Sequence, residues 1–265
     1  MRIEAVSEPG DPEVPNEDYA SVALPATGRG GALVVLDGVT PPPDGTGCEH
    51  DVPWYVARLG GALLELSGSR RYMTLTQCLS SAIERTASAH GPRCDLSHRR
   101  TPQATVVLAR WDEAVVEHLV LSDSALLVED PDGAVTPVLD TRLDRLRPAA
   151  RALPPGERVA HLEGLRNVEG GFFTAAADPA VAERAVTGRL PRARVRALAA
   201  LSDGATRWAE TFRLGDWGAL MTVLRTEGPR SLVARVRAAE AADRAGTAHP
   251  RGKTHDDATA VLVEL

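Results

Sequence analysis

The stretch "GALVVLDG", residues 31–38, joins a run of apolar residues to a carboxylate and a glycine. A short, uniformly apolar run is typical of a central strand that is covered on both faces. Asp37 and Gly38 end this strand, and "VTPPP" follows at 39–43. Because a buried unpaired charge is costly, we expect the aspartate at its tip to be exposed, paired or bound to a cation.

The segments around this strand group into blocks of strand-like and helix-like patterns. "YASVALPA" (19–26) predicts a strand that forms a hairpin with 31–38 through the turn "TGRGG". Two helices are expected at 51–68 and 74–90, the second with Thr74 as its N-cap. Further along, the patterns predict four strands, at 103–111, 114–124, 125–129 and 134–139, and then a helical region within 141–170. Residues 170–188 are expected to form a strand and then a helix capped by Asp178. The rest of the chain is expected to form a strand at 194–204, helices at about 215–226 and 229–244, and a last strand at the C-terminus.

This grouping predicts an α+β protein with mainly antiparallel sheets rather than a strictly alternating parallel sheet. A chain of 265 residues can bury a large core. We expect one domain that spans residues 1–265.

Composition narrows the range of partners. The net charge of −6 argues against a nucleic-acid partner, which needs a basic surface. The N-terminus has no apolar signal region and no apolar run is long enough to cross a membrane, so we expect a cytoplasmic protein that does not bind membranes. The three cysteines show no CxxC pair, which is typical of free thiols in a reducing compartment. The oligomeric state stays open.

Acidic residues recur where strands begin or end. Asp37 and Asp203 follow apolar strands, Asp123 lies in a turn, and Glu17–Asp18 and Asp256–Asp257 precede strands. If these ends converge, the like charges repel, and hard divalent cations relieve that repulsion. Aspartate is also common in ordinary turns, so the alternative is a set of unrelated surface turns.

Taken in order, these motifs resemble those of the metal-dependent protein phosphatases called the PP2C or PPM family. They are "NED" at 16–18, "LDG" at 36–38, "SDS" at 122–124, "LSDG" at 201–204 and "DDAT" at 256–259. The resemblance spans nearly the whole chain. It implies an α-β-β-α sandwich of two mainly antiparallel sheets flanked by helices.

The resemblance also implies a metal centre with two or three Mn²⁺ or Mg²⁺ ions. Asp37 would bridge two ions and Gly38 would offer its carbonyl to one of them. Asp203 and Asp256 would complete the pair, and Glu17 and Asp18 would bind or orient metal-bound waters. Asp123 would serve a third, looser ion. Thr105 would be structural.

The chain departs from the family pattern around the substrate. Glu13 stands where relatives carry a phosphate-gripping arginine, which removes a bidentate clamp. The paired glycines expected after Asp37 are missing from "DGVTP", and "SDSA" lacks a glycine and an arginine. Arg207 and Lys253 are the nearest basic candidates for the phosphate.

The segment 40–56 directly follows Asp37, so we expect it to line the cleft. Within it, His50 is a candidate general acid, with His255 as the second candidate. Cys48, Trp54 and Tyr55 are candidates for shaping a pocket there. The alternative for Trp54 and Tyr55 is that they anchor the following helix in the core.

The leading hypothesis is a Mn²⁺- or Mg²⁺-dependent phosphatase in which a metal-activated water attacks phosphorus. The substrate would be a phosphoserine or phosphothreonine protein or a small phosphorylated metabolite. The alternative is a catalytically inactive relative that uses the fold for regulation or binding. An unrelated α+β protein would keep Asp37 and Asp203 more than about 10 Å apart, farther than one ion's ligands can reach.

Overall fold

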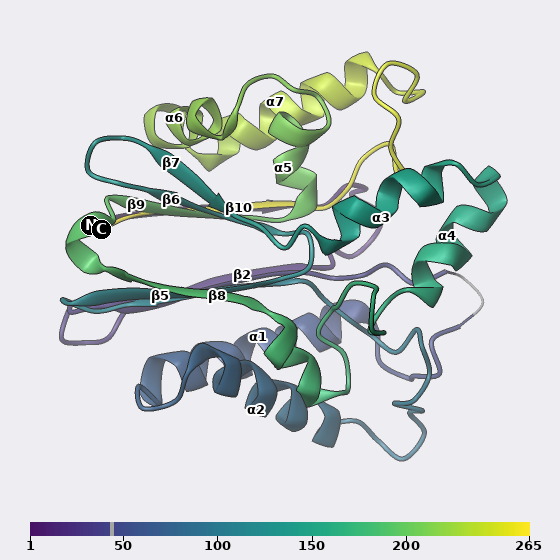
Figure 1. Ribbon diagram of the computed structural model, residues 1–265, viewed down its shortest axis with the longest axis horizontal. Coiled ribbons are helices and arrows are strands. Elements are labelled where there is room, and N and C mark those ends of the chain that lie inside the picture. The colour runs from purple at the N-terminus through teal and green to yellow at the C-terminus, as the bar shows by residue number, and fades with distance from the viewer. Residues whose placement is uncertain (43–44) are drawn as a thin grey trace.

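The computed structural model describes residues 1–42 and 45–265 and contains two five-stranded sheets packed face to face, with helices on both outer sides (Figure 1). Neighbouring strands in both sheets are antiparallel. This architecture confirms the predicted α-β-β-α sandwich. Part of the segment 40–56 lies outside the described residues, at Pro43 and Asp44.

The strand order differs from the order along the chain in both sheets. The first sheet runs β1 (Arg2–Glu8), β10 (Ala258–Glu264), β9 (Ala197–Leu201), β6 (Ala125–Glu129) and β7 (Val135–Val138). The second sheet runs β2 (Asp18–Ala23), β3 (Gly31–Asp37), β4 (Val106–Trp111), β5 (Val115–Leu121) and β8 (Val186–Pro191).

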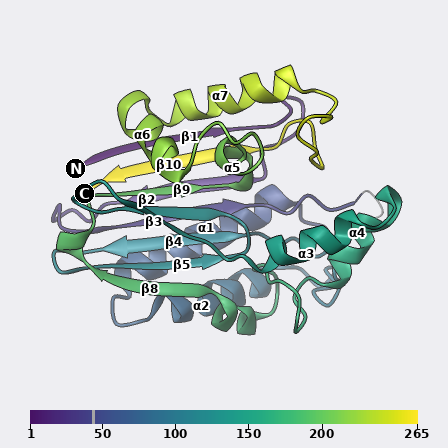
Figure 2. The ribbon, with the colours of Figure 1, turned by 45° about the horizontal axis from the view of Figure 1, so that its top comes forward.

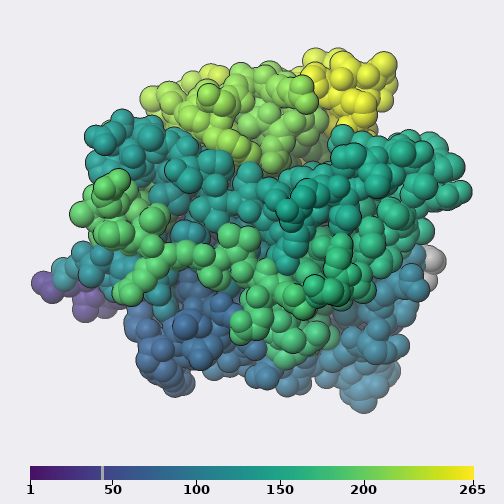
Figure 3. Space-filling model, in the orientation of Figure 1, coloured from purple at the N-terminus to yellow at the C-terminus, as the bar shows by residue number. Residues whose placement is uncertain are grey.

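Helices cover the two outer faces and one end of the sandwich (Figures 1 and 2). The second sheet carries α1 (Val52–Ser69) and α2 (Leu75–Ser88), and the first carries α5 (Asp203–Glu210), α6 (Trp217–Glu227) and α7 (Pro229–Ala242). The remaining helices, α3 (Arg142–Arg151) and α4 (Pro155–Gly164), stand out from the right end in the space-filling view (Figure 3). None of the helices in the described chain has both the length and the apolar character that a bilayer-spanning helix needs.

Local sequence signals explain most of these elements. Asp51 caps α1 by accepting a hydrogen bond from the Trp54 N–H at 2.9 Å. Thr74 caps α2, as the sequence predicted, and it forms a capping box with Gln77. Asp130 closes the β6–β7 turn by accepting from two backbone N–H groups.

Several elements differ from expectation. The strands β1 and β8 and the short helix α5 were not predicted from the sequence. Within 170–188 the structure has isolated bridges rather than a strand, followed by a 3₁₀-helix at Pro179–Arg184. Its cap, Asp178, is as predicted, but the helix has only six residues before the chain enters β8, and short segments of this kind often take the tighter 3₁₀ form.

Candidate active site

The antiparallel register brings the acidic strand ends to one end of the sandwich. Asp18 begins β2 and stands directly opposite Asp37, the last residue of β3. Asp203 begins α5 in the other sheet's helical layer, and its backbone N–H donates to the Asp37 Oδ2 at 3.2 Å. The acids of the two halves therefore meet, and the interpretation as unrelated surface turns does not fit this contact.

Two glycines allow this close approach. A Cβ at Gly38 would lie 2.5 Å from the backbone oxygen of Glu17, and one at Gly204 would lie 2.0 Å from that of Asp257. Backbone cannot retreat as a flexible side chain can, so any larger residue would push the acid-bearing segments apart.

Asp18, Asp37 and Asp203 have no basic partner within 4.0 Å among the described residues. Both carboxylate oxygens of Asp18 are shielded from solvent and lack a hydrogen-bond partner. Burial, reinforced by the neighbouring acids, raises the pKa of Asp18 to about 7 and that of Asp203 to about 8. Burial and then the charge of Asp203 also hold the pKa of Asp37 well above its usual range.

Two other acids of the cleft, Asp256 and Asp123, are neutralised in part by basic side chains of the protein. Asp256 accepts from Arg207 at 2.8 Å and from Lys253 at 2.7 Å, one on each oxygen. Asp123 accepts from Arg147 at 2.7 Å. Glu17 accepts only from the Thr40 hydroxyl, and its pKa is raised, chiefly by burial.

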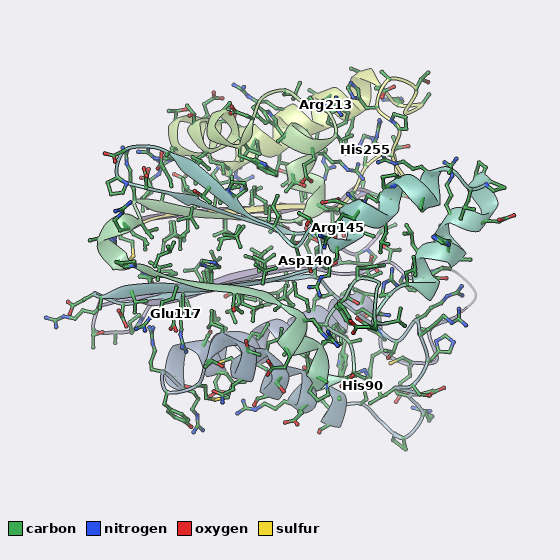
Figure 4. All side chains as sticks on the ribbon, viewed as in Figure 1. His90, Glu117, Asp140, Arg145, Arg213 and His255 are labelled. Carbon is green, nitrogen blue, oxygen red and sulfur yellow. The ribbon has the colours of Figure 1, made fainter. Side chains whose placement is uncertain are left out.

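Arg207 also belongs to a buried ion network behind the cleft. Its guanidinium donates to the Glu240 carboxylate at 2.6 Å, and Arg237 donates to the same carboxylate at 2.9 Å. The Nδ1 atom of His255 lies 2.8 Å from Glu240 (Figure 4 labels His255). Two residues that the sequence suggested for phosphate or proton transfer, Arg207 and His255, are thus engaged with Glu240.

Sequence reasoning assigned no role to two acids that hold the site in place. Asp257 accepts from the backbone N–H groups of Gly10 and Glu17 at 2.8 and 2.7 Å, which ties the N-terminal loop to the end of the chain. Asp140, at the end of the β7 segment, accepts from the Ser122 N–H at 3.0 Å and from Arg142 (Figure 4 labels Asp140). Asp257 had a signal, since it adjoins Asp256; Asp140 had none.

The turn that carries Asp123 explains one departure from the family pattern. Ser122 has φ = 70°, in the left-handed region that favours glycine. The glycine expected by resemblance at this position would adopt that φ freely, whereas serine is strained there. The turn survives because Asp140 holds its backbone N–H.

The side chains of residues 45–56 that the sequence suggested for the cleft make their contacts elsewhere. His50 stacks on Trp54, with ring centroids 3.8 Å apart, and its other ring contact is with His90. Tyr55 is buried against the second sheet and donates to the Ala176 carbonyl at 3.0 Å, so it is an anchor of α1. Within the described part of the chain, the contacts of His50 are with Trp54, His90 and the Cys48 thiol and not with the acids of the cleft.

The donor set suits hard divalent cations only in part of the cleft. Asp18, Asp37 and Asp203 offer buried carboxylate oxygens without a basic partner, which fits Mn²⁺ or Mg²⁺. The arrangement is not a closed cage, however, because no three of the described acids in the cleft bring ligand atoms within 4.8 Å of one another. Asp256 would have to exchange Lys253 or Arg207 for an ion.

A cavity of about 610 Å³ opens beside these acids and is lined by both Asp203 and Asp256. Its other walls are strongly basic, with Arg147 and Arg151 from α3 and Arg213 from the α5–α6 turn. Such a lining attracts anions to the edge of the acidic cluster.

The fold is that of bacterial serine/threonine phosphatases of the PP2C class. The chain superposes over its full length on serine/threonine phosphatase Stp1 from Staphylococcus aureus, with a TM-score of 0.61, 14% identity and 95% of that chain covered. The serine/threonine phosphatase PstP/Ppp of Mycobacterium tuberculosis gives 0.60 and 18% identity, with 100% of this chain and 98% of the other covered. The PstP catalytic domain in complex with two manganese ions gives 0.58 and 19%, with 99% and 97% covered. No protein-family model and no curated protein sequence matches the chain.

Proposed function

We propose that this protein is a metal-dependent phosphatase that hydrolyses a phosphate monoester. The observation that carries the proposal is the convergence of Asp18, Asp37 and Asp203, buried and without basic partners, at one end of the sandwich. Such a cluster is stable only if protons or cations neutralise it.

Asp37, Asp203 and Asp256 would hold Mn²⁺ or Mg²⁺, with Gly38, Glu17 and Asp18 beside them and Asp123 at a possible third ion. When bound, such ions lower the pKa of a water and stabilise the charge that develops on the phosphoryl group. The chain's own residues fix the carboxylates: the Asp203 N–H orients the Asp37 carboxylate, and Asp257 fixes the backbone of Glu17.

The basic cavity compensates for Glu13, which is exposed and lies outside the cavity lining. Arg151 and Arg213 are exposed at the cavity, and Arg147 already reaches Asp123. Guanidinium groups bind phosphate oxygens bidentately, so these arginines would grip the substrate from the α3 side. His50 has no place in this proposal, and water would protonate the leaving group.

The substrate would be a phosphoserine or phosphothreonine protein or a small phosphorylated metabolite. Residues 1–265 would form one phosphatase domain, which would act in the cytoplasm and on neither nucleic acid nor membranes. The neighbours of the same fold that are serine/threonine phosphatases favour the phosphoprotein.

The test is hydrolysis of p-nitrophenyl phosphate and of a phosphothreonine peptide by the full chain with EDTA, Mg²⁺ or Mn²⁺. Activity should require the metal and be lost in Asp37→Asn. The matched control is Asp132→Asn, which changes an exposed acid in the β6–β7 turn and should leave the rate unchanged. Absence of hydrolysis under every metal would overturn the proposal.

A second candidate is a catalytically inactive protein that binds a partner through the same fold. The observation in its favour is that Asp256 already has an internal cation on each oxygen, which leaves that carboxylate satisfied without an ion. Calorimetry separates the two functions: millimolar Mn²⁺ binds to a phosphatase in an Asp37-dependent way and gives no such heat in the inactive protein.

A further inference from the structure

A second group of potential metal ligands lies on the α1–α2 layer, outside the acidic cleft. Two loops supply it, one that precedes α1 and carries "CEH" (48–50) and one that follows α2 and carries "HGPRC" (90–94). Figure 4 shows His90 on the lower helical layer, on the opposite side of the molecule from His255, which adjoins the acidic cleft. The two groups are therefore separate.

The two loops are tied together by their backbones. The Asp95 N–H donates to the Gly47 carbonyl at 2.7 Å, which joins the two loops. Within the second loop, the Cys94 N–H donates to the Gly91 carbonyl at 3.1 Å and fixes the turn that carries Cys94. Gly47 has φ = 70°, and it packs so closely on His98 that an added Cβ would lie 2.8 Å from the Cβ of His98. The approach of the loops is thus built into the chain.

The side chains that meet there have the chemistry of a transition-metal site. The Sγ atoms of Cys48 and Cys94 lie 3.3 Å apart. Ligand atoms of Cys94, His50 and Glu49 all lie within 4.8 Å of one another, and this is the group of that kind in the described chain. Two thiolates on one tetrahedral zinc ion, each bonded at about 2.3 Å, are roughly 3.8 Å apart, so the cysteines need to separate only slightly.

His90 adds an independent observation. Its Nδ1 lies 2.9 Å from the Thr86 carbonyl, which can only accept, so Nδ1 carries the proton. The Nε2 lone pair is then bare, and this atom is shielded from solvent without a hydrogen-bond partner. A histidine that donates one nitrogen to a backbone carbonyl and keeps the other free is in the state that binds a metal. Its ring lies 5.4 Å from that of His50, centroid to centroid.

We propose that Cys48, His50, Cys94 and His90 form a structural site for a thiolate-binding transition metal of the Zn²⁺ class. Glu49 is the weaker candidate for the fourth position, because it is exposed and already paired with Arg93 at 2.5 Å. Binding would release the two thiol protons to solvent and would fix the start of α1 to the end of α2. Without a cation the Cys48 thiol stays protonated, since burial raises its pKa to about 11.

The same pair of cysteines would form a disulfide in an oxidising compartment, and the experiment separates that outcome. The full chain is purified under reducing conditions, stripped with EDTA and titrated with Co²⁺, which reports its ligands by absorption. Sulfur-to-cobalt charge transfer appears only where thiolates bind, so the all-oxygen ligands of the acidic cleft cannot produce it.

We expect one charge-transfer signal that saturates at one cobalt ion per chain and is displaced by Zn²⁺. It should be lost in Cys94→Ser and Cys48→Ser and should change in shape in His90→Ala. The matched control is Cys78→Ala, which removes the cysteine buried inside α2 and should leave the signal unchanged. Asp37→Asn should also leave it unchanged.

Three results would overturn the proposal. The first is reduced wild-type protein that gives no charge-transfer signal, which needs no variant to fold. The second is a signal that persists in Cys94→Ser. The third is freshly isolated protein in which Cys48 and Cys94 are joined as a disulfide and, after reduction, still bind no cobalt.

Discussion

The acidic cleft has two halves that differ in how their carboxylates are neutralised. In the unpaired half (Asp18, Asp37 and Asp203) no basic side chain lies within 4.0 Å in the described structure. In the paired half (Asp123, Asp140 and Asp256) each carboxylate accepts from an arginine. The paired half can be stable by itself, whereas the unpaired half requires protons or cations.

Aspartates in the two halves therefore have opposite effects on the stability of the fold. An aspartate paired with arginine stabilises the fold, and its loss leaves a buried cation alone. An aspartate in the unpaired half costs stability unless an ion is bound, a cost that is typical of functional sites.

The sharpest test makes the same substitution in both halves. Asp203→Asn should lower metal-dependent hydrolysis by roughly 10³-fold, the equivalent of about 4 kcal/mol of barrier. It should also raise the melting temperature of the EDTA-treated protein, because it removes a buried charge that has no basic partner. Asp140→Asn should lower the melting temperature with or without Mn²⁺. Differential scanning fluorimetry measures the melting temperatures of both variants. A melting-temperature shift of the same sign in the two variants would contradict the distinction between the halves.

The pH dependence of stability gives the next largest effect. In the unpaired half the folded pKa values, about 7 for Asp18 and about 8 for Asp203, lie above the unfolded value near 4. Between these limits the folded state binds more protons than the unfolded state, so stability must fall as pH rises. Asp18 alone should cost the metal-free protein roughly 3 kcal/mol of unfolding free energy between pH 5 and pH 8, and Asp203 should add a further loss.

Urea unfolding with EDTA across this range measures the slope. His118, whose pKa is lowered by burial, acts in the opposite direction below about pH 6.5. Comparison with Asp18→Asn cancels that contribution, because both proteins contain His118. Equal slopes in the two proteins would show that Asp18 is not protonated in the folded state.

The network behind the paired half gives a smaller effect. Glu240 is fully buried and receives Arg207, Arg237 and His255. Glu240→Gln keeps the shape but leaves the cations undercompensated, so we expect a loss of about 2 kcal/mol. The matched control is Glu227→Gln, whose pairing with Arg235 is exposed and screened by solvent, so its loss should be much smaller. Chemical denaturation measures both, and equal losses would contradict a special role for the buried network.

The sequence predicted the sandwich and the motifs of the cleft because both depend on local patterns. The apolar run 31–36 and the turn at 27–31 determine where Asp37 ends its strand, and register then brings Asp18 opposite it. By contrast, Arg207 is paired with Glu240 on α7, a helix that is separate in the sequence and meets α5 only in the folded structure. The sequence therefore could not show this pairing. The cluster around Cys48 was missed for the same reason, since its other half follows a different helix.

The sequence did not predict the short elements, and this too has a physical reason. The helix α5 has eight residues, and its stability comes from packing on β9 and β10 rather than from its own sequence. The strand β8 is mostly exposed and lacks the apolar alternation that identifies a strand. Only the tertiary arrangement defines such elements.

The smallest effect belongs to the turn that carries Asp123. Ser122 has φ = 70°, so Ser122→Gly removes backbone strain but also increases the freedom of the unfolded chain. The left-handed conformation costs a non-glycine residue about 1 kcal/mol, so we expect a net gain of roughly 0.5 kcal/mol. The same change at Ser88, an exposed residue at the end of α2, should lower stability by up to about 1 kcal/mol because its backbone is helical. If both variants lose stability equally, the turn is not strained, and its serine needs no support from the Asp140 carboxylate.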